Sequence, residues 1–251
     1  VSLRGVGKTF SRGTEALRDF DLDVFAGEFL SLLGPSGCGK STALRLIAGL
    51  AEPTAGTIQR PARESVGFVF QEPTLMPWAS ALENVRLPLR LAGTDATVAR
   101  ERAREVLDWV GLSGFEKAYP RELSGGMKMR VSIARALVTQ PRLLLMDEPF
   151  AALDEITRLR LNDDLLALWQ RQTFTVVFVT HSVYESVYLS SRVAVLSDRP
   201  GRLLGEIEVE APLPRGAEFR HSAAYAAACR AVSAHLERAM AVNPSPREIS
   251  V

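Results

Sequence analysis

Cysteine, net charge and long apolar runs are all scarce in this chain of 251 residues. The two cysteines, Cys38 and Cys229, lie far apart and form no C-x-x-C or Cys/His pattern. This spacing predicts no zinc site and favours a reducing compartment. Thirty basic and 29 acidic side chains leave a net charge of +1, so we expect no overall attraction to nucleic acid.

No uninterrupted apolar run approaches the roughly 18 residues that a membrane-spanning helix needs. The first ten residues, VSLRGVGKTF, also lack the apolar centre of a signal peptide. The hydrophobic content of 47% is ordinary for a globular chain of this length, which can bury a full core. We therefore expect a soluble, cytoplasmic protein that works at a membrane only through a partner.

Two kinds of apolar pattern predict an α/β fold. Residues 19–25, DFDLDVF, alternate as in a strand with one buried face. Several short runs are almost continuously apolar, as expected for strands covered on both faces of a parallel sheet. These runs are residues 28–34, 142–147 and 173–180, and residues 192–198 resemble them.

The middle of the chain has helical periodicity instead. Residues 83–91, 94–112 and 125–140 follow this pattern, with Thr94 as a predicted N-cap and Pro141 as a stop. We expect a helical subdomain inserted at about 72–140 into a domain of residues 1–205. A C-terminal extension, 206–251, would hold a strand at 206–210, a Pro-rich link at 211–216 and one surface helix at 222–240.

The segment GPSGCGKST matches the pattern G-x-x-x-x-G-K-[ST], with a buried-type strand before it and a helix-like segment after it. Glycines in such a loop let consecutive N–H groups point at phosphate oxygens, Lys40 would neutralise the β and γ phosphates, and the Ser41 hydroxyl would bind Mg²⁺. A plain glycine-rich turn would need neither the lysine nor the serine. The predicted nucleotide-binding residues are Gly34, Pro35, Ser36, Gly37, Cys38, Gly39, Lys40, Ser41 and Thr42.

The apolar run RLLLMD ends in two carboxylates, Asp147 and Glu148. Ligands of open α/β sheets bind at this edge of the strands, so Asp147 is predicted to join the Mg²⁺ shell. Glu148 is predicted to polarise the attacking water as general base. The alternative is a pair of solvated acids at a strand end.

Gln71 and His181 each follow an apolar run as well. Gln71 would orient water or join the Mg²⁺ shell, or it is a surface amide. His181 is either a catalytic residue or a structural one. The residues alone leave both alternatives open.

A second glycine-rich helix start, LSGGMKMR, spans residues 123–130. Its free N–H groups suit an anion. Together with GPSGCGKST, FQ at 70–71, LLLMDEP at 143–149, FAALD at 150–154 and TH at 180–181, it resembles the ATPase subunits of ABC transporters in order and spacing. The resemblance extends from Phe10 to about residue 205.

This resemblance implies a P-loop NTPase core with a mainly parallel sheet, an N-terminal antiparallel β region and an inserted helical subdomain. It implies that ATP and Mg²⁺ are bound, that Gln71 links nucleotide to the membrane subunits, and that His181 contacts the γ-phosphate. Phe10 matches the aromatic residue that stacks on adenine, although a phenylalanine of the core is an equal alternative.

In this family two ATPase subunits pair head to tail, so the resemblance implies that Ser124, Gly125 and Gly126 bind the γ-phosphate held by a second copy. Lys128 and Met129 depart from the commonest form of this segment, in which an Arg-Gln pair follows.

The segments PTLMPWASALENV (73–85), THSVYESVYLSSRV (180–193) and RPGRLL (199–204) are most similar to the importer branch for nitrate, sulfonates, taurine and related solutes. The implied partners are integral-membrane permease subunits and an external solute-binding protein, with the chain peripheral on the cytoplasmic face of the inner membrane. Residues 75–78, LMPW, would line a groove for the permease or pack within the insert.

Two other classes of P-loop protein are alternatives to an importer subunit. An ABC ATPase acting on DNA or ribosomes would be expected to carry coiled-coil or tandem insertions, and none fits in 251 residues. A P-loop kinase or GTPase would lack LSGGM and would need an acceptor or base-recognition motif, which we do not find.

Overall fold

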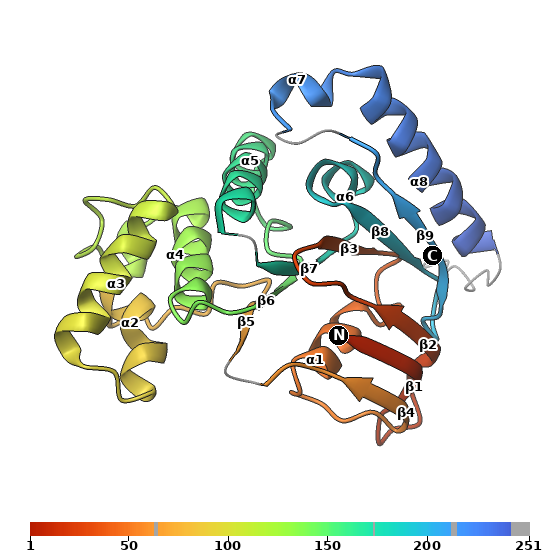
Figure 1. The fold of residues 1–251 in the computed structure, drawn as a ribbon, viewed down its shortest axis with the longest axis horizontal. Helices are drawn as coiled ribbons and strands as arrows, with labels where there is room; N and C mark the ends of the chain where they lie inside the picture. The colour runs from red at the N-terminus through yellow and green to blue at the C-terminus, as the bar shows by residue number, and fades with distance from the viewer. Residues whose placement is uncertain (63–64, 173, 212–214, 242–251) are drawn as a thin grey trace, which may run out of the picture. The chain divides into compact units, whose positions relative to one another are not determined.

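A computed structural model describes residues 1–62, 65–172, 174–211 and 215–241 (Figure 1). Its contacts divide the chain into two compact units. The first unit combines Val1–Arg60 with Val177–Val251, and the second is Pro61–Val176. The chain therefore leaves the first unit once and returns to it. The predicted domain boundaries, near 72, 140 and 205, stay predictions.

The first unit contains an antiparallel sheet in the order β2-β1-β4. Its strands are β1 (Ser2–Thr9), β2 (Glu15–Asp23) and β4 (Ala55–Gln59). In β2 the predicted alternation is confirmed, because Phe20 and Leu22 are buried. The turn that follows contains Gly27, whose φ of 76° is in the left-handed region that glycine adopts without strain. The N-terminal antiparallel region is thus confirmed.

The second layer of this unit contains three largely buried strands and the partly exposed edge strand β9, in the order β7-β3-β8-β9, where β7 enters the unit at Val177. They are β3 (Phe29–Leu33), β7 (Thr175–Thr180), β8 (Arg192–Leu196) and β9 (Leu203–Glu208). β3 and β8 are parallel, and every residue in both is buried, as the continuous apolar runs predicted. β9 is antiparallel to β8 and begins three residues before the predicted strand at 206–210.

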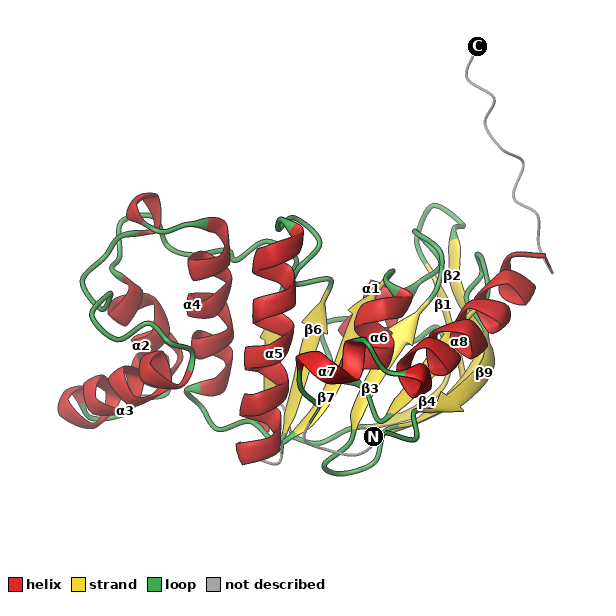
Figure 2. Ribbon diagram, turned by 90° about the horizontal axis from the view of Figure 1, so that it is seen from above, coloured by secondary structure: helices red, strands yellow, loops and turns green. Residues whose placement is uncertain are grey.

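Among the described residues, the first unit also contains four helices. They are α1 (Lys40–Ile47), α6 (Val183–Leu189), α7 (Ala217–Arg220) and α8 (Ala223–Ala241). The alanine-rich helix is confirmed: α8 lies against α6, β8 and β9 (Figure 2). It buries Tyr225, Cys229, Val232 and Ala239 along one face, so the small side chains between them lie toward solvent. Of the predicted link, residues 212–214 lie outside the described residues.

The second unit contains the parallel pair β5 (Val66–Val69) and β6 (Leu143–Asp147). Its helices are α2 (Ala81–Leu91), α3 (Ala96–Trp109), η2 (Pro120–Glu122), α4 (Gly125–Leu137) and α5 (Glu155–Gln172). Helices α2, α3 and α4 pack on one another, and their positions confirm the three helices expected from periodicity. Within the described ranges, no helix combines the length and apolar character that crossing a bilayer requires.

The predicted N-cap of α3 is wrong by one residue. Asp95, not Thr94, caps this helix, and its Oδ1 accepts from the N–H groups of Thr97 (2.8 Å) and Val98 (3.2 Å). The backbone N–H of Thr94 instead donates to the carbonyl of Leu89 at the end of α2. Threonine and aspartate both cap helices well. Here Thr94 is part of the C-terminal end of α2, which leaves Asp95 to cap α3.

Candidate functional site

The predicted phosphate loop lies between β3 and α1 in the first unit. Gly37 (φ 77°) and Gly39 (φ 109°) adopt left-handed conformations that only glycine takes readily. A Cβ on Gly39 would also lie 2.6 Å from the carbonyl oxygen of Ala16. These two glycines are therefore required by the backbone, independently of any ligand.

Lys40 begins helix α1 and is 4% exposed. Its Nζ donates to the carbonyl oxygens of Gly34 (2.8 Å) and Pro35 (2.7 Å), which fixes the ammonium across the loop. Ser41 and Thr42 follow in the first turn of the same helix. A buried cation and a helix N-terminus with a positive dipole meet here, which is the electrostatic requirement for a polyphosphate.

Cys38 lies inside this loop and is fully buried. Desolvation raises the pKa of its thiol, and the nearby Lys40 ammonium opposes this shift only in part. Burial and the raised pKa both favour a protonated, shielded thiol over an activated nucleophile.

His181 follows β7 directly, and β7 lies beside β3 in the first unit. Its side chain is exposed, so it is not a buried core histidine. Hydrogen bonds hold the segment around it, because the Thr180 hydroxyl donates to Glu185 (2.6 Å) and accepts from the N–H of Ser182 (3.0 Å). The position at a strand end is the one that the sequence predicted.

The acidic residues and Gln71 belong to the second unit. In the parallel pair β5–β6, Val69 is opposite Met146, so Gln71 and Asp147 emerge at the same edge. Asp147 is 8% exposed, whereas Gln71 is exposed. The structure thus brings these two predicted Mg²⁺ ligands to neighbouring strand ends.

Glu148 has a φ of 46°, an uncommon conformation for a residue with a side chain. Such strain costs about 1–3 kcal/mol and is concentrated at functional sites. Asp19, Thr74 and Gln140 also have a positive φ, but among the predicted catalytic and metal-binding residues only Glu148 does, an observation that is independent of the motif.

Ser124 is the N-cap of α4, and its Oγ accepts from the N–H of Met127 at 3.3 Å. The first N–H groups of the helix, on Gly125 and Gly126, precede the intrahelical ladder and can bind an anion. Ser124 and Gly125 are exposed, but Gly126 is buried against α5, where a Cβ would lie 2.6 Å from Thr157 Cγ2. Gly126 therefore also has a packing role.

Phe10 follows β1 and is 45% exposed, with Lys8 Nζ 5.5 Å from its ring centre. The alternative of a core phenylalanine is therefore wrong.

The segment 75–78 is held in place although it contains no regular structure. Asn84 bonds both the N–H (2.8 Å) and the carbonyl (3.2 Å) of Met76, and Arg135 donates to the carbonyls of Pro73 and Thr74. Trp78 is 76% exposed on this support. Sequence reasoning missed the roles of Asn84 and Arg135, because both act through the backbone of a loop and such contacts leave no pattern in the sequence.

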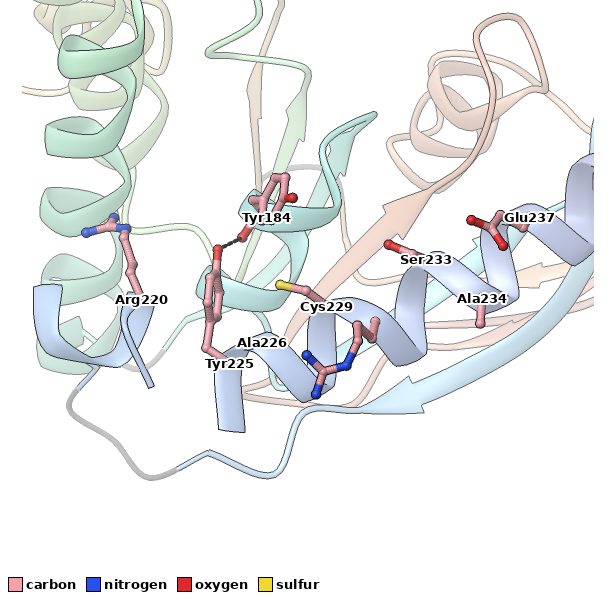
Figure 3. Close-up of a pocket in the computed structure, with 9 residues that line it drawn as sticks. Tyr184, Arg220, Tyr225, Ala226, Cys229, Ser233, Ala234 and Glu237 are labelled. Atoms are coloured by element: carbon pink, nitrogen blue, oxygen red, sulfur yellow. Dashed lines mark hydrogen bonds between the residues drawn. The ribbon is translucent and has the colours of Figure 1, made fainter. Parts of the chain in front are cut away.

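A separate cavity of about 500 Å³ lies between α6 and α8 (Figure 3). Tyr225 closes one side, and its hydroxyl donates to the carbonyl of Tyr184 at 3.0 Å. None of the residues predicted for nucleotide binding or hydrolysis lines this cavity.

A strand–glycine loop–helix carrying Lys40, and a buried strand ending in Asp147 and Glu148, define a P-loop nucleotide-hydrolysing protein. Comparison with known proteins narrows this class. The ABC transporter family model matches residues 17–151, more than half of the chain, and the chain belongs to this family. It is an ATPase of the P-loop α/β fold, as the motifs predicted.

Three similar proteins illustrate the relationship. An uncharacterized ABC transporter ATP-binding protein of Methanocaldococcus jannaschii is 50% identical over 80% of this chain and 78% of its own length. The aliphatic sulfonates import ATP-binding protein SsuB of Bacillus licheniformis is 45% identical over 86% of this chain and 87% of its own. A dimeric ATP-binding cassette, solved in a post-hydrolysis state with ADP and Pi, is 35% identical with a TM-score of 0.73, over 84% of this chain and 99% of that one.

Proposed function

We propose that this chain is the ATP-hydrolysing subunit of an importer that takes up a small solute through a partner permease. The buried Lys40 ammonium in a glycine-rich loop carries the ATPase part of this proposal. The sulfonate importer named above supports the transport part and points to sulfonates, with taurine, nitrate and related solutes as the alternatives.

Nucleotide would bind along the first unit, from the exposed ring of Phe10 to the phosphate loop. The adenine would stack on Phe10, a residue that is 45% exposed. The loop N–H groups and Lys40 would hold the phosphates, and His181 would donate to the γ-phosphate. Glu148 would accept a proton from the attacking water.

Mg²⁺ fits the predicted ligand set, since the Ser41 hydroxyl, the Gln71 amide oxygen and the Asp147 carboxylate are the hard oxygen donors that this ion prefers. Gln71 and Asp147 lie at the ends of two neighbouring parallel strands, at the same edge of the sheet, which supports the proposal that they bind one ion. When bound, Mg²⁺ would neutralise charge that develops on the β and γ phosphates.

A second copy of the chain would complete each site. Ser124, Gly125 and Gly126 would present the N-terminus of α4 to the γ-phosphate held by the partner's loop. The exposure of Ser124 and Gly125 supports this arrangement, and the dimeric cassette with ADP and Pi is a relative that forms a pair. ATP would then bind two subunits together until it is hydrolysed.

The permease would dock on the segment 75–78, peripheral to the cytoplasmic face of the membrane. An exposed Trp78 on a loop fixed by Asn84 and Arg135 supports this, because exposed aromatic side chains on a rigid support mark protein contacts. An external solute-binding protein would select the solute, and no nucleic acid would be involved.

Reconstitution tests the transport assignment. The chain, assembled with its permease in vesicles so that this subunit faces the lumen, should accumulate a radiolabelled alkanesulfonate when ATP is enclosed in the lumen and the solute is supplied outside with the solute-binding protein. Omission of ATP and the Lys40→Ala variant are the controls, and both should abolish uptake. Uptake of nitrate or taurine in place of the sulfonate would reassign the transported solute, whereas ATP-independent uptake, or no uptake of any of these solutes by the assembled complex, would argue against an ATP-driven importer.

A further inference from the structure

A loop after β8, residues 197–202, packs directly on the phosphate loop within the first unit. The Ser197 hydroxyl donates to the Pro200 carbonyl at 3.0 Å and accepts from the N–H of Arg202 at 2.9 Å, which closes the loop on itself. The Gly201 N–H donates to Ala16 (2.9 Å), and its carbonyl accepts from Arg18 (3.1 Å). The 197–202 loop is therefore anchored to β2 by two backbone hydrogen bonds.

This loop contacts two successive carbonyl groups of the phosphate loop. Arg199 Nε donates to the carbonyl of Gly37 at 3.0 Å. The backbone of Gly201 lies so near the carbonyl of Cys38 that a Cβ there would be 2.1 Å from its oxygen. The guanidinium also covers Gly37, since a Cβ on that glycine would lie 3.1 Å from Arg199 Nη2.

The direction of these carbonyls decides which way the N–H groups of the loop point. A trans peptide unit is planar, with C=O and N–H on opposite sides, so a Gly37 carbonyl held toward Arg199 turns the Cys38 N–H away from Arg199. This N–H makes a long 3.4 Å bond to the carbonyl of Pro35, within the phosphate loop itself. Gly37 adopts a positive φ of 77°, and glycine permits such a peptide unit to rotate unless something holds it.

We propose that Arg199 is a positioning residue for nucleotide binding: it locks the Gly37–Cys38 peptide so that the Cys38 N–H faces the phosphates. Its positive charge adds to the attraction of the loop for an anion. This inference rests on the proposed nucleotide site. It assigns a role to a residue that belongs to none of the nucleotide-binding motifs and lies 162 positions from its partner in the sequence.

Arg202 provides a matched control in the same loop. Its side chain is 46% exposed and lies 3.5 Å from Asp19, so its removal deletes the same charge without touching the phosphate loop. Arg199→Lys keeps the charge and one donor, and Arg199→Ala removes both.

The experiment measures the dissociation constant for ADP by calorimetry and the KM and kcat for ATP on the full chain. Arg199→Ala should raise the dissociation constant and KM about tenfold, with kcat within about twofold, since a hydrogen bond from a charged group is worth roughly that factor. Arg199→Lys should recover part of the loss, and Arg202→Ala should bind as the wild type does. The melting temperature without nucleotide should stay the same for all three, which a purely structural role would not predict.

Lys40→Ala is measured beside these variants. If it loses ADP binding while Arg199→Ala keeps wild-type affinity, the positioning role is overturned and the nucleotide site stands. An equal loss in Arg202→Ala would also overturn the role, because general charge would then explain the effect. Wild-type affinity in Lys40→Ala would overturn the nucleotide site itself and the inference with it.

Discussion

Lys40 and Glu148 should separate nucleotide binding from hydrolysis at the scale of single residues. Lys40→Ala removes the buried ammonium of the phosphate loop, so ATP affinity itself should fall. Glu148→Gln keeps the shape of the side chain but removes the base, so binding should persist while turnover falls about 10²–10⁴-fold. Calorimetry and phosphate release measure the two effects. Turnover near the wild-type rate in Glu148→Gln would remove this residue as general base.

Cys38 should react with thiol reagents slowly at neutral pH, and faster as pH rises. Burial raises the pKa of this thiol above its ordinary value. The reactive thiolate is therefore scarce at neutral pH, and its fraction increases as the pH approaches the raised pKa. Bound ATP should slow labelling further, because Cys38 lies inside the phosphate loop. Timed labelling from pH 7 to 9.5, followed by mass spectrometry, measures this.

Cys229 serves as the internal comparison in this labelling experiment, since it is also buried with a raised pKa but lies on α8. ATP should protect Cys38 and leave the rate at Cys229 unchanged. Fast labelling of Cys38 at pH 7, or labelling that ATP does not affect, would contradict the loop geometry.

At the scale of elements, Gly126 allows α4 and α5 to approach within the second unit. Gly126→Ala would bring a Cβ to 2.6 Å from Thr157 Cγ2, and overpacking of this kind costs about 1–3 kcal/mol of unfolding free energy. Gly125→Ala is the milder control, since its Cβ would lie 3.3 Å from the flexible end of Leu153. Urea denaturation measures both.

A second substitution tests the cause of that loss. Thr157→Ser removes the Cγ2 methyl group, so in the Gly126→Ala background it should restore stability, giving a favourable coupling in a double-mutant cycle. Independent, additive effects would mean that Gly126 serves the backbone and not the packing of α4 on α5.

Elements with a strong local pattern could be predicted from the sequence. β3 and β6 are continuous apolar runs, and α4 has both a helical period and a serine cap. β4 could not be predicted, because its five residues are largely exposed and owe their conformation to pairing with β1, about 50 residues earlier. Buried and exposed residues alternate only weakly in β1, which also pairs with strands distant in the sequence.

The motifs identified the candidate site residues, but not the residues that support them. The hydrogen bond from Arg199 to Gly37 joins positions 162 residues apart, and the bonds from Arg135 to the 73–74 carbonyls also connect distant segments. Contacts between side chains and distant backbone carbonyls leave no local period or spacing in the sequence. The strain at Glu148 is likewise visible only in the backbone conformation.

At the scale of the whole molecule, the account requires a second copy. The phosphate loop and the α4 N-terminus belong to different units of the chain, and the central claim is that each LSGGM segment completes the site of its partner. ATP then contributes to the interface, and hydrolysis dissolves it. A variant that binds ATP without hydrolysing it should therefore accumulate as a dimer.

Light scattering coupled to size-exclusion chromatography, with and without ATP, tests this claim most directly. Glu148→Gln should be monomeric alone and dimeric with ATP. Adding Ser124→Arg places a bulky side chain where the partner's γ-phosphate would approach, so the double variant should stay monomeric while binding ATP with unchanged affinity. An ATP-dependent dimer in the double variant, or loss of ATP binding by its monomer, would contradict the composite site.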